Sequence, residues 1–187
     1  MIKRDQKGFT LIELLVVLAI IALIAIAATT TTFQVLASTK RSNDHMTAIR
    51  QVQNAGYWIS NDAQMAQSVV TDDVPETPEF LVLNWTEWDE GKKKKDSKYH
   101  LVTYSFQDLS DGIGKLKRQY LIKNANDEPI GDGVTTLVAE YIYYNPGDPE
   151  NSSFFEPQDG RWILRIQARK GTATETREYE VTPRVNM

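Results

Sequence analysis

The sequence predicts an α+β protein in which a long N-terminal helix, first transmembrane and then amphipathic, packs on an antiparallel β-sheet domain. Three observations carry this prediction: an unbroken apolar run over residues 14–28, an apolar stripe at helical spacing after it, and period-two alternation in the C-terminal half. The 187 residues are enough for one domain and an anchor. The chain contains no cysteine, which excludes disulfides and thiolate sites, and its formal net charge of −4 disfavours nucleic acid as the main partner.

The first predicted element is a membrane-spanning half-helix over residues 9–33. The run Leu14–Ala28 alone falls short of the about 20 residues that a bilayer requires. Phe9–Ile12 and the threonines after Ala28 lengthen it, because threonine hydroxyls can bond back to helix carbonyls. Residues 1–8 carry three basic side chains against one acidic side chain, which predicts a cytoplasmic leader and a C-terminal part beyond the membrane.

A single carboxylate, Glu13, stands at the head of the apolar run. An ionisable residue at membrane depth costs about 2.5–3.5 kcal/mol on insertion scales, so it is a functional candidate by default. A secretory signal peptide has its cleavage site after the apolar region. Here the only small-residue junction with a charged flank, Gly8-Phe9, comes before that region. Cleavage at this junction would leave Phe9 as a new amino terminus on the helix.

The gapless stretch KGFTLIELLV at residues 7–16 resembles the type IV prepilin signal, which type IV pilins, competence pilins and type II secretion pseudopilins share. The resemblance implies that a prepilin peptidase cuts after Gly8 and that Phe9 becomes the N-methylated first residue. It also implies that Glu13 pairs with the terminal amine of a neighbouring subunit during assembly. Two alternatives stay open: an uncleaved N-terminal anchor, and a Glu13 carboxylate that is favoured by the helix dipole.

The same resemblance implies partners and a location. The partners are other pilins or pseudopilins, the prepilin peptidase, an inner-membrane assembly platform and membrane lipid. The expected location is the bacterial inner membrane, crossed once, with the N-terminus cytoplasmic and the C-terminal domain periplasmic or extracellular. From there the protein would enter a pilus or pseudopilus.

The helix is predicted to continue to Val70 as an amphipathic half over residues 34–70. No proline occurs before Pro75, so nothing forces a break. A coiled coil is the competing interpretation, but the apolar stripe uses small residues and lacks sustained Leu or Ile at heptad positions. The stripe has steps of three and four residues: Met46, Ile49, Val52, Gly56, Ile59, Ala63, Ala66 and Val70.

Residues 71–187 are predicted to form the β domain, which begins with a breaker-rich linker over residues 72–78. Alternation places Val102, Tyr104 and Phe106 on one buried face, and the same pattern recurs through Trp162–Ala168. Gly171–Ala173 is predicted to be the turn of a C-terminal hairpin. The expected strands are Phe80–Trp85, Tyr99–Phe106, Leu116–Lys123, Leu137–Tyr144, Trp162–Ala168 and Thr176–Val181.

Looser similarities suggest which kind of prepilin this is. The end of the helix, residues 59–69, and the order of segments over residues 133–162 are similar to J-type minor pseudopilins and W-type minor pilins. A minor component at or near the filament tip is therefore expected. The alternatives are the major filament subunit and a surface-binding or DNA-binding pilin that uses the charge run Lys92–Lys95.

Other chemistry finds little support in the sequence. His45 and His100 are far apart with no ligand spacing, so a catalytic or metal role is not expected for either. The loop Asn145–Asn151 has oxygen ligands but not the order of an EF-hand loop, and Asp62 is expected to bond locally. The prediction is a protein that is not an enzyme and has no cofactor or metal.

Overall fold

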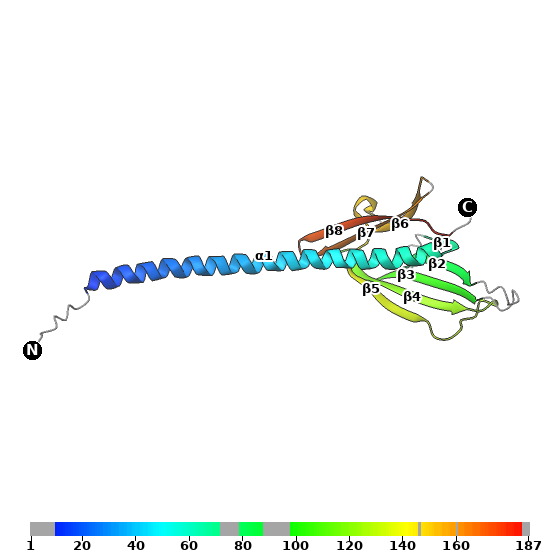
Figure 1. Ribbon diagram of the computed structural model, residues 1–187, viewed down its shortest axis with the longest axis horizontal. Helices are drawn as coiled ribbons and strands as arrows, with labels where there is room; N and C mark the ends of the chain where they lie inside the picture. Colours follow the sequence, from blue (N-terminus) through cyan, green and yellow to red (C-terminus); the bar gives the residue numbers. More distant parts are fainter. Residues whose placement is uncertain (1–9, 72–78, 88–97, 146, 160, 185–187) are drawn as a thin grey trace, which may run out of the picture. The chain divides into compact units, whose positions relative to one another are not determined.

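The computed structural model describes residues 10–71, 79–87, 98–145, 147–159 and 161–184. These residues form one long helix, α1 (Leu11–Met65), eight strands, β1 to β8, and a short 3-10 helix, η2 (Pro149–Asn151) (Figure 1). The chain divides into two compact units, Met1–Asn43 and Asp44–Met187, and α1 contributes a part to each.

The described part of the first unit is helical, and every side chain from residue 10 to residue 43 is exposed. The hydroxyls of Thr29 to Thr32 each donate a hydrogen bond to the carbonyl four residues earlier, over 2.8 to 2.9 Å. This confirms the expected back-bonding, which lets the threonines lie in an apolar environment. The proposed boundary at residue 33 between a membrane half and an amphipathic half remains a prediction.

The part of α1 in the second unit is amphipathic, as predicted, but its stripe is shifted. Val52, Gly56, Ile59 and Ala63 are buried, whereas Met46 is 46% exposed. The buried positions of the helix begin instead at Ala48 and include three residues that the predicted stripe lacks: Ala48, Ala55 and Asp62. All the buried positions are Ala48, Val52, Ala55, Gly56, Ile59, Asp62 and Ala63.

The predicted end of the helix at Val70 is wrong, because α1 ends at Met65 and β1 (Ser68–Val70) follows. The chain leaves the helix to pair with β2 (Glu79–Glu87). The backbone N–H of Gln67 donates to the carbonyl of Asn84 over 2.8 Å, and the Gln67 side chain accepts from the Thr86 N–H over 3.1 Å. Strand pairing therefore replaces the last helical turn, although no proline ends the helix.

All six predicted strands are confirmed. They are β2, β3 (Lys98–Ser110), β4 (Ile113–Lys123), β5 (Val134–Tyr143), β7 (Arg161–Lys170) and β8 (Ala173–Val181). Gly171, in the left-handed region at φ 57°, lies in the predicted turn between β7 and β8. Two strands were not predicted: β1, which has three residues, and β6 (Phe154–Gln158), which contains a proline.

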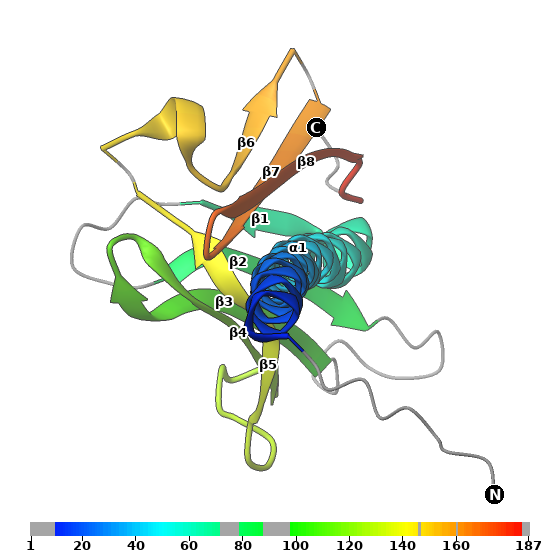
Figure 2. The same ribbon diagram turned by 90° about the vertical axis from the view of Figure 1, so that its left-hand side faces the viewer.

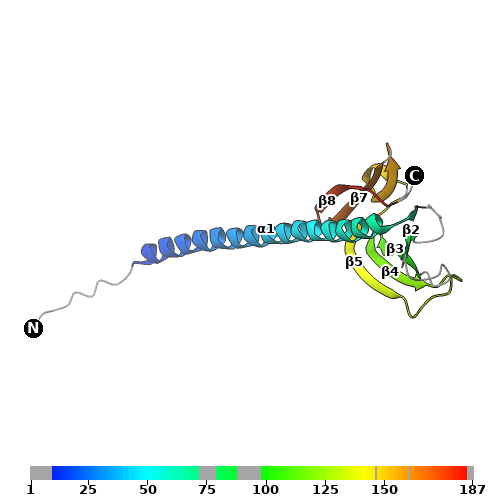
Figure 3. The same cartoon turned by 45° about the vertical axis from the view of Figure 1, so that its right-hand side comes forward.

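The eight strands form one antiparallel sheet in the order β1-β2-β3-β4-β5-β7-β6, with β8 on the other edge of β7. The sheet has two parts, because β5 meets β7 only where Ile142 pairs with Ala168. Beside this junction Tyr141 has a φ of 60°, which interrupts the regular strand. Figures 2 and 3 show β2–β5 on one side of the second unit's helix segment and β7–β8 on the other. The α+β class is confirmed.

The core lies between this helix segment and the helix-facing side of the sheet. Val102, Tyr104 and Phe106 are at most 2% exposed, as the alternation predicts. Leu164, Ile166 and Ala168 are fully buried from β7. On the other face of β7, Gln167 is buried too. Its polar groups are satisfied there, since its backbone N–H donates to Ser153 Oγ over 3.0 Å and its side chain bonds to Thr176.

Candidate assembly site

The first turn of α1 positions Glu13. Thr10 precedes the helix, and the backbone N–H of Glu13 donates to Thr10 Oγ1 over 3.3 Å and to the Thr10 carbonyl over 3.1 Å. Thr10 and Glu13 thus have the T-x-x-E spacing of a capping box, and the threonine side chain satisfies one free N–H of the helix end. This arrangement holds the Glu13 carboxylate at the positive end of the helix dipole, where negative charge is favoured.

Glu13 is exposed, and its carboxylate has no ion-pair partner within the described ranges. Gly8 and Phe9, the predicted cleavage and methylation residues, lie outside those ranges. The geometry between the Phe9 amine and Glu13 therefore stays a prediction. The structure places the Glu13 carboxylate at the exposed start of α1.

The apolar surface that follows Glu13 has no protein cover in the described chain. Helix α1, near the N-terminus, contains an 18-residue window apolar enough to cross a membrane, and none of this window is buried. Leu11 is 82% exposed and Leu23 is 68% exposed. Apolar area costs about 25 cal/mol per Å² when it faces water, so this surface requires lipid or other apolar helices around it.

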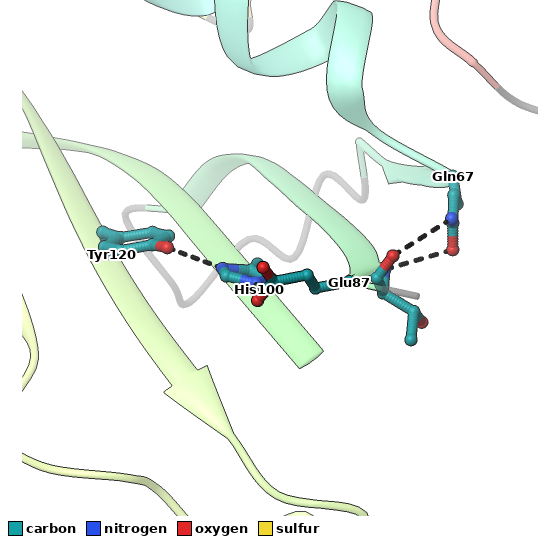
Figure 4. A network of polar contacts seen from close by, with 5 residues as sticks. Gln67, Glu87, His100 and Tyr120 are labelled. Carbon is teal, nitrogen blue, oxygen red and sulfur yellow. Dashed lines mark hydrogen bonds and ion pairs between the residues drawn. The ribbon is translucent and has the colours of Figure 1, made fainter. Parts of the chain in front are cut away.

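The two histidines lie in unrelated places. His45 is exposed on α1, whereas His100 on β3 is half-buried. His100 Nδ1 is 2.6 Å from the Tyr120 hydroxyl, and Nε2 is 3.5 Å from the Glu87 carboxylate (Figure 4). The His100 ring also stacks on Trp85 at a centroid distance of 5.3 Å. Sequence spacing could not reveal this cluster, since its members come from three adjacent strands.

The contacts of the Asp62 side chain differ from the sequence-based prediction. Asp62 was expected to bond locally, but it is 1% exposed and bonds to the sheet. Arg118 donates to both of its carboxylate oxygens, from Nε over 2.6 Å and from a terminal nitrogen over 2.9 Å, and Tyr104 donates its hydroxyl proton over 2.5 Å. The guanidinium also lies over the rings of Trp58 and Tyr120, at 5.2 and 5.1 Å.

The electrostatics of this cluster keep Tyr104 and Arg118 protonated. Burial, then the Asp62 charge and its hydrogen bond, raise the pKa of Tyr104 far above the ordinary 10.0. Burial lowers the pKa of Arg118, but the bonds and charge of Asp62 outweigh it, so the net change is upward. The tyrosine therefore remains a donor and the arginine a cation, and the cluster joins α1 to the sheet rather than releasing protons.

Side-chain oxygen atoms in the loop around Asn145 accept hydrogen bonds from within the loop. The Asn145 side-chain oxygen accepts from the Gly147 N–H over 3.0 Å, and the Asp148 carboxylate accepts from the Asn151 amide over 3.1 Å. No group of three potential metal-binding side chains was found among the residues that the structure describes. The charge run Lys92–Lys95 lies outside them.

Residues 3–29 match the family model of the prokaryotic N-terminal methylation motif. This match and the exposed apolar helix support a type IV prepilin-like protein with a membrane anchor. The helix on an antiparallel sheet is consistent with the α+β fold of type IV pilins, a structural family whose members are processed by a prepilin peptidase and assemble with other pilins. No curated protein and no solved structure matches the chain.

Proposed function

We propose that this protein is a minor pilin or pseudopilin that is cut after Gly8, N-methylated on Phe9 and built into a type IV pilus or type II secretion pseudopilus. The observation that carries the proposal is the methylation motif at residues 3–29, which runs directly into an apolar helix surface with no cover of its own. A cleaved signal peptide would discard this surface, whereas cleavage at Gly8 keeps it for assembly.

Glu13 supplies the specificity of assembly in this proposal. After cleavage the Phe9 amine and the Glu13 carboxylate each carry a charge that is costly in lipid unless it is paired. The carboxylate is exposed at the first turn of α1, where it can meet the amine of a neighbouring subunit. Such a pair aligns adjacent helices at one register in an otherwise uniform apolar contact.

The orientation follows from charge. The basic leader stays in the cytoplasm, α1 crosses the inner membrane once, and the second unit lies on the periplasmic or extracellular side. A place at or near the filament tip is proposed from the similarity of residues 59–69 and 133–162 to J-type pseudopilins and W-type minor pilins. The partners are then other pilins and the inner-membrane assembly platform.

Processing tests the first step. Gly8→Val is expected to abolish cleavage in cells with an active prepilin peptidase, because the added side chain occupies the position before the cut bond. Intact-protein mass spectrometry should find wild-type protein as methylated residues 9–187 and the variant at full length. Gly147→Val, at an exposed loop glycine, is the matched control and should be processed normally. Full-length wild-type protein in such cells contradicts the proposal.

Assembly tests the second step. Glu13→Gln removes the charge and keeps the size, so the protein should be cleaved and methylated but reach the sheared filament fraction at less than about a tenth of the wild-type amount, since one buried charge pair is worth several kcal/mol. Immunoblots of filament and membrane fractions measure this ratio. Gln34→Glu, which adds a carboxylate further along the exposed helix, controls for charge alone and should not restore assembly to Glu13→Gln. Normal incorporation of Glu13→Gln would refute the assigned role.

A further inference from the structure

The second unit has a groove between α1 and β8 that the proposed function does not use. It has a volume of about 360 Å³, and we call it the α1–β8 groove. Six of its residues come from α1 and two from the last strand. They are Gln53, Gly56, Tyr57, Ser60, Asn61, Gln64, Arg177 and Tyr179.

The groove exists because the helix and the strand approach each other closely at one point. The ring of Tyr179 lies where a side chain on Gly56 would be, 2.3 Å from the position of a Cβ atom. Its hydroxyl donates to the carbonyl of Val52 over 3.3 Å. This contact forms the floor of the groove, and polar side chains before and after Gly56 on the helix form its wall.

The wall has the chemistry to bind amide groups. The side-chain amides of Gln53, Asn61 and Gln64 each offer a carbonyl acceptor and an N–H donor. Ser60 Oγ is buried and has no hydrogen-bond partner among the described residues. Its hydroxyl is therefore not used by the fold of the second unit.

The charge of the groove disfavours an ionic ligand. No carboxylate lines it, and its one charged residue, Arg177, lies 3.4 Å from the Glu175 carboxylate on the same strand. The neutral amide donors and acceptors of Gln53, Asn61 and Gln64 can pair with a peptide backbone. Tyr57, a residue that is 68% exposed, adds an aromatic surface of the kind that anchors protein partners.

The position of β8 adds a second argument for an extended segment. Within the described ranges β8 pairs with β7 and with no other strand. A peptide that lies in the groove runs beside this last strand and can extend its layer, with main-chain hydrogen bonds on one side and the amide wall on the other. Strand addition of this kind is a common way to recognise extended peptides.

We propose that the α1–β8 groove binds an extended peptide segment of another pilin subunit. The inference rests on the proposed function, since it takes the occupant from the filament to which this protein would belong. It adds a contact in the second unit to the one that Glu13 makes in the first. The two contacts involve separate residues and can be tested separately.

The absence of cysteine from the chain makes a site-specific test possible. Asn61→Cys places one thiol on an exposed helical residue that lines the groove, and Asn54→Cys places it on an exposed residue of the same helix that does not. Each full-length variant is labelled with benzophenone maleimide in assembling cells and irradiated. Mass spectrometry then identifies the cross-linked peptide.

The expected result is a cross-link from position 61 to one segment of a pilin subunit, with at least about tenfold less from position 54. Tyr57→Ala should lower the yield from position 61 about tenfold, as loss of an aromatic anchor does, and Tyr57→Phe should keep it. Three results would overturn the inference. They are a cross-link from position 61 to lipid or glycan alone, equal yields from positions 61 and 54, and no cross-link from either position. If the wild-type protein is nevertheless cleaved and found in filaments, the proposed function stands.

Discussion

Individual residues decide how the second unit holds together. Asp62 lies next to small apolar residues on the buried face of α1. Sequence spacing alone does not show whether such a carboxylate is buried or lies exposed at the edge of that face. The Asp62 partner Arg118 is 56 positions further along the chain, and Tyr104 is 42 positions further. A buried ion pair costs desolvation energy, and it is tolerated here because both carboxylate oxygens accept hydrogen bonds.

Breaking the Asp62–Arg118 ion pair should destabilise the second unit more than breaking an exposed ion pair. Asp62→Asn or Arg118→Met is expected to cost about 3–5 kcal/mol, because each leaves a partner buried without its counter-charge. The matched control is Arg161→Met, which removes a cross-strand pair whose side chains are 66% and 52% exposed and should cost less than about 1 kcal/mol. Urea unfolding of residues 44–187 measures all three.

The double variant Asp62→Asn/Arg118→Met should lose less stability than the sum of its single changes, since neither charge is then left alone. Equal losses for Arg118→Met and Arg161→Met would show that the Asp62 cluster is not the main polar link between helix and sheet.

At the scale of elements, one glycine sets how closely α1 approaches β8. The helix segment packs small residues against the sheet, and Gly56 is the point where an aromatic ring replaces a side chain of the helix. Helical spacing predicts Gly56 on the apolar stripe, and this is confirmed because Gly56 is buried. The spacing could not explain why glycine stands there, because the reason is the ring of Tyr179 from the far end of the chain.

Gly56→Ala tests this contact. Alanine favours a helix over glycine by about 1 kcal/mol, but the new methyl group meets the Tyr179 ring, and overpacking costs about 1–3 kcal/mol. A net loss of about 1 kcal/mol is therefore expected in urea unfolding. In a Tyr179→Ala background the same change should instead stabilise by about 1 kcal/mol, because the ring is gone. A stabilising Gly56→Ala in the wild-type background would contradict the close contact.

For the whole molecule, the division at residue 43 separates two environments. The first unit exposes every described side chain of an apolar helix, whereas the second buries a core between a helix and a sheet. The core does not depend on the first unit, because its members begin at Ala48.

The fragment of residues 44–187 should therefore fold without the membrane helix. It is expected to be monomeric in detergent-free buffer and to unfold in one cooperative transition, as single domains of this size usually do. The full-length protein should remain in the membrane fraction until detergent is added. Circular dichroism with urea and size-exclusion chromatography measure the fragment, and a fragment that aggregates or melts without cooperativity would show that its core needs the first unit.

The sequence by itself determined the class of the protein. The prepilin-like start is a short local motif, so the order of residues was enough to predict it. The apolar helix, the amphipathic stripe and six of the eight described strands follow from the spacing of apolar residues, because this spacing shows which face of an element is buried. Only the tertiary structure decided where α1 gives way to β1, which distant side chain Asp62 binds, and why Gly56 is needed. These features depend on residues that meet only after the sheet has formed, and the period of a sequence shows which face is buried but not which residue lies across from it.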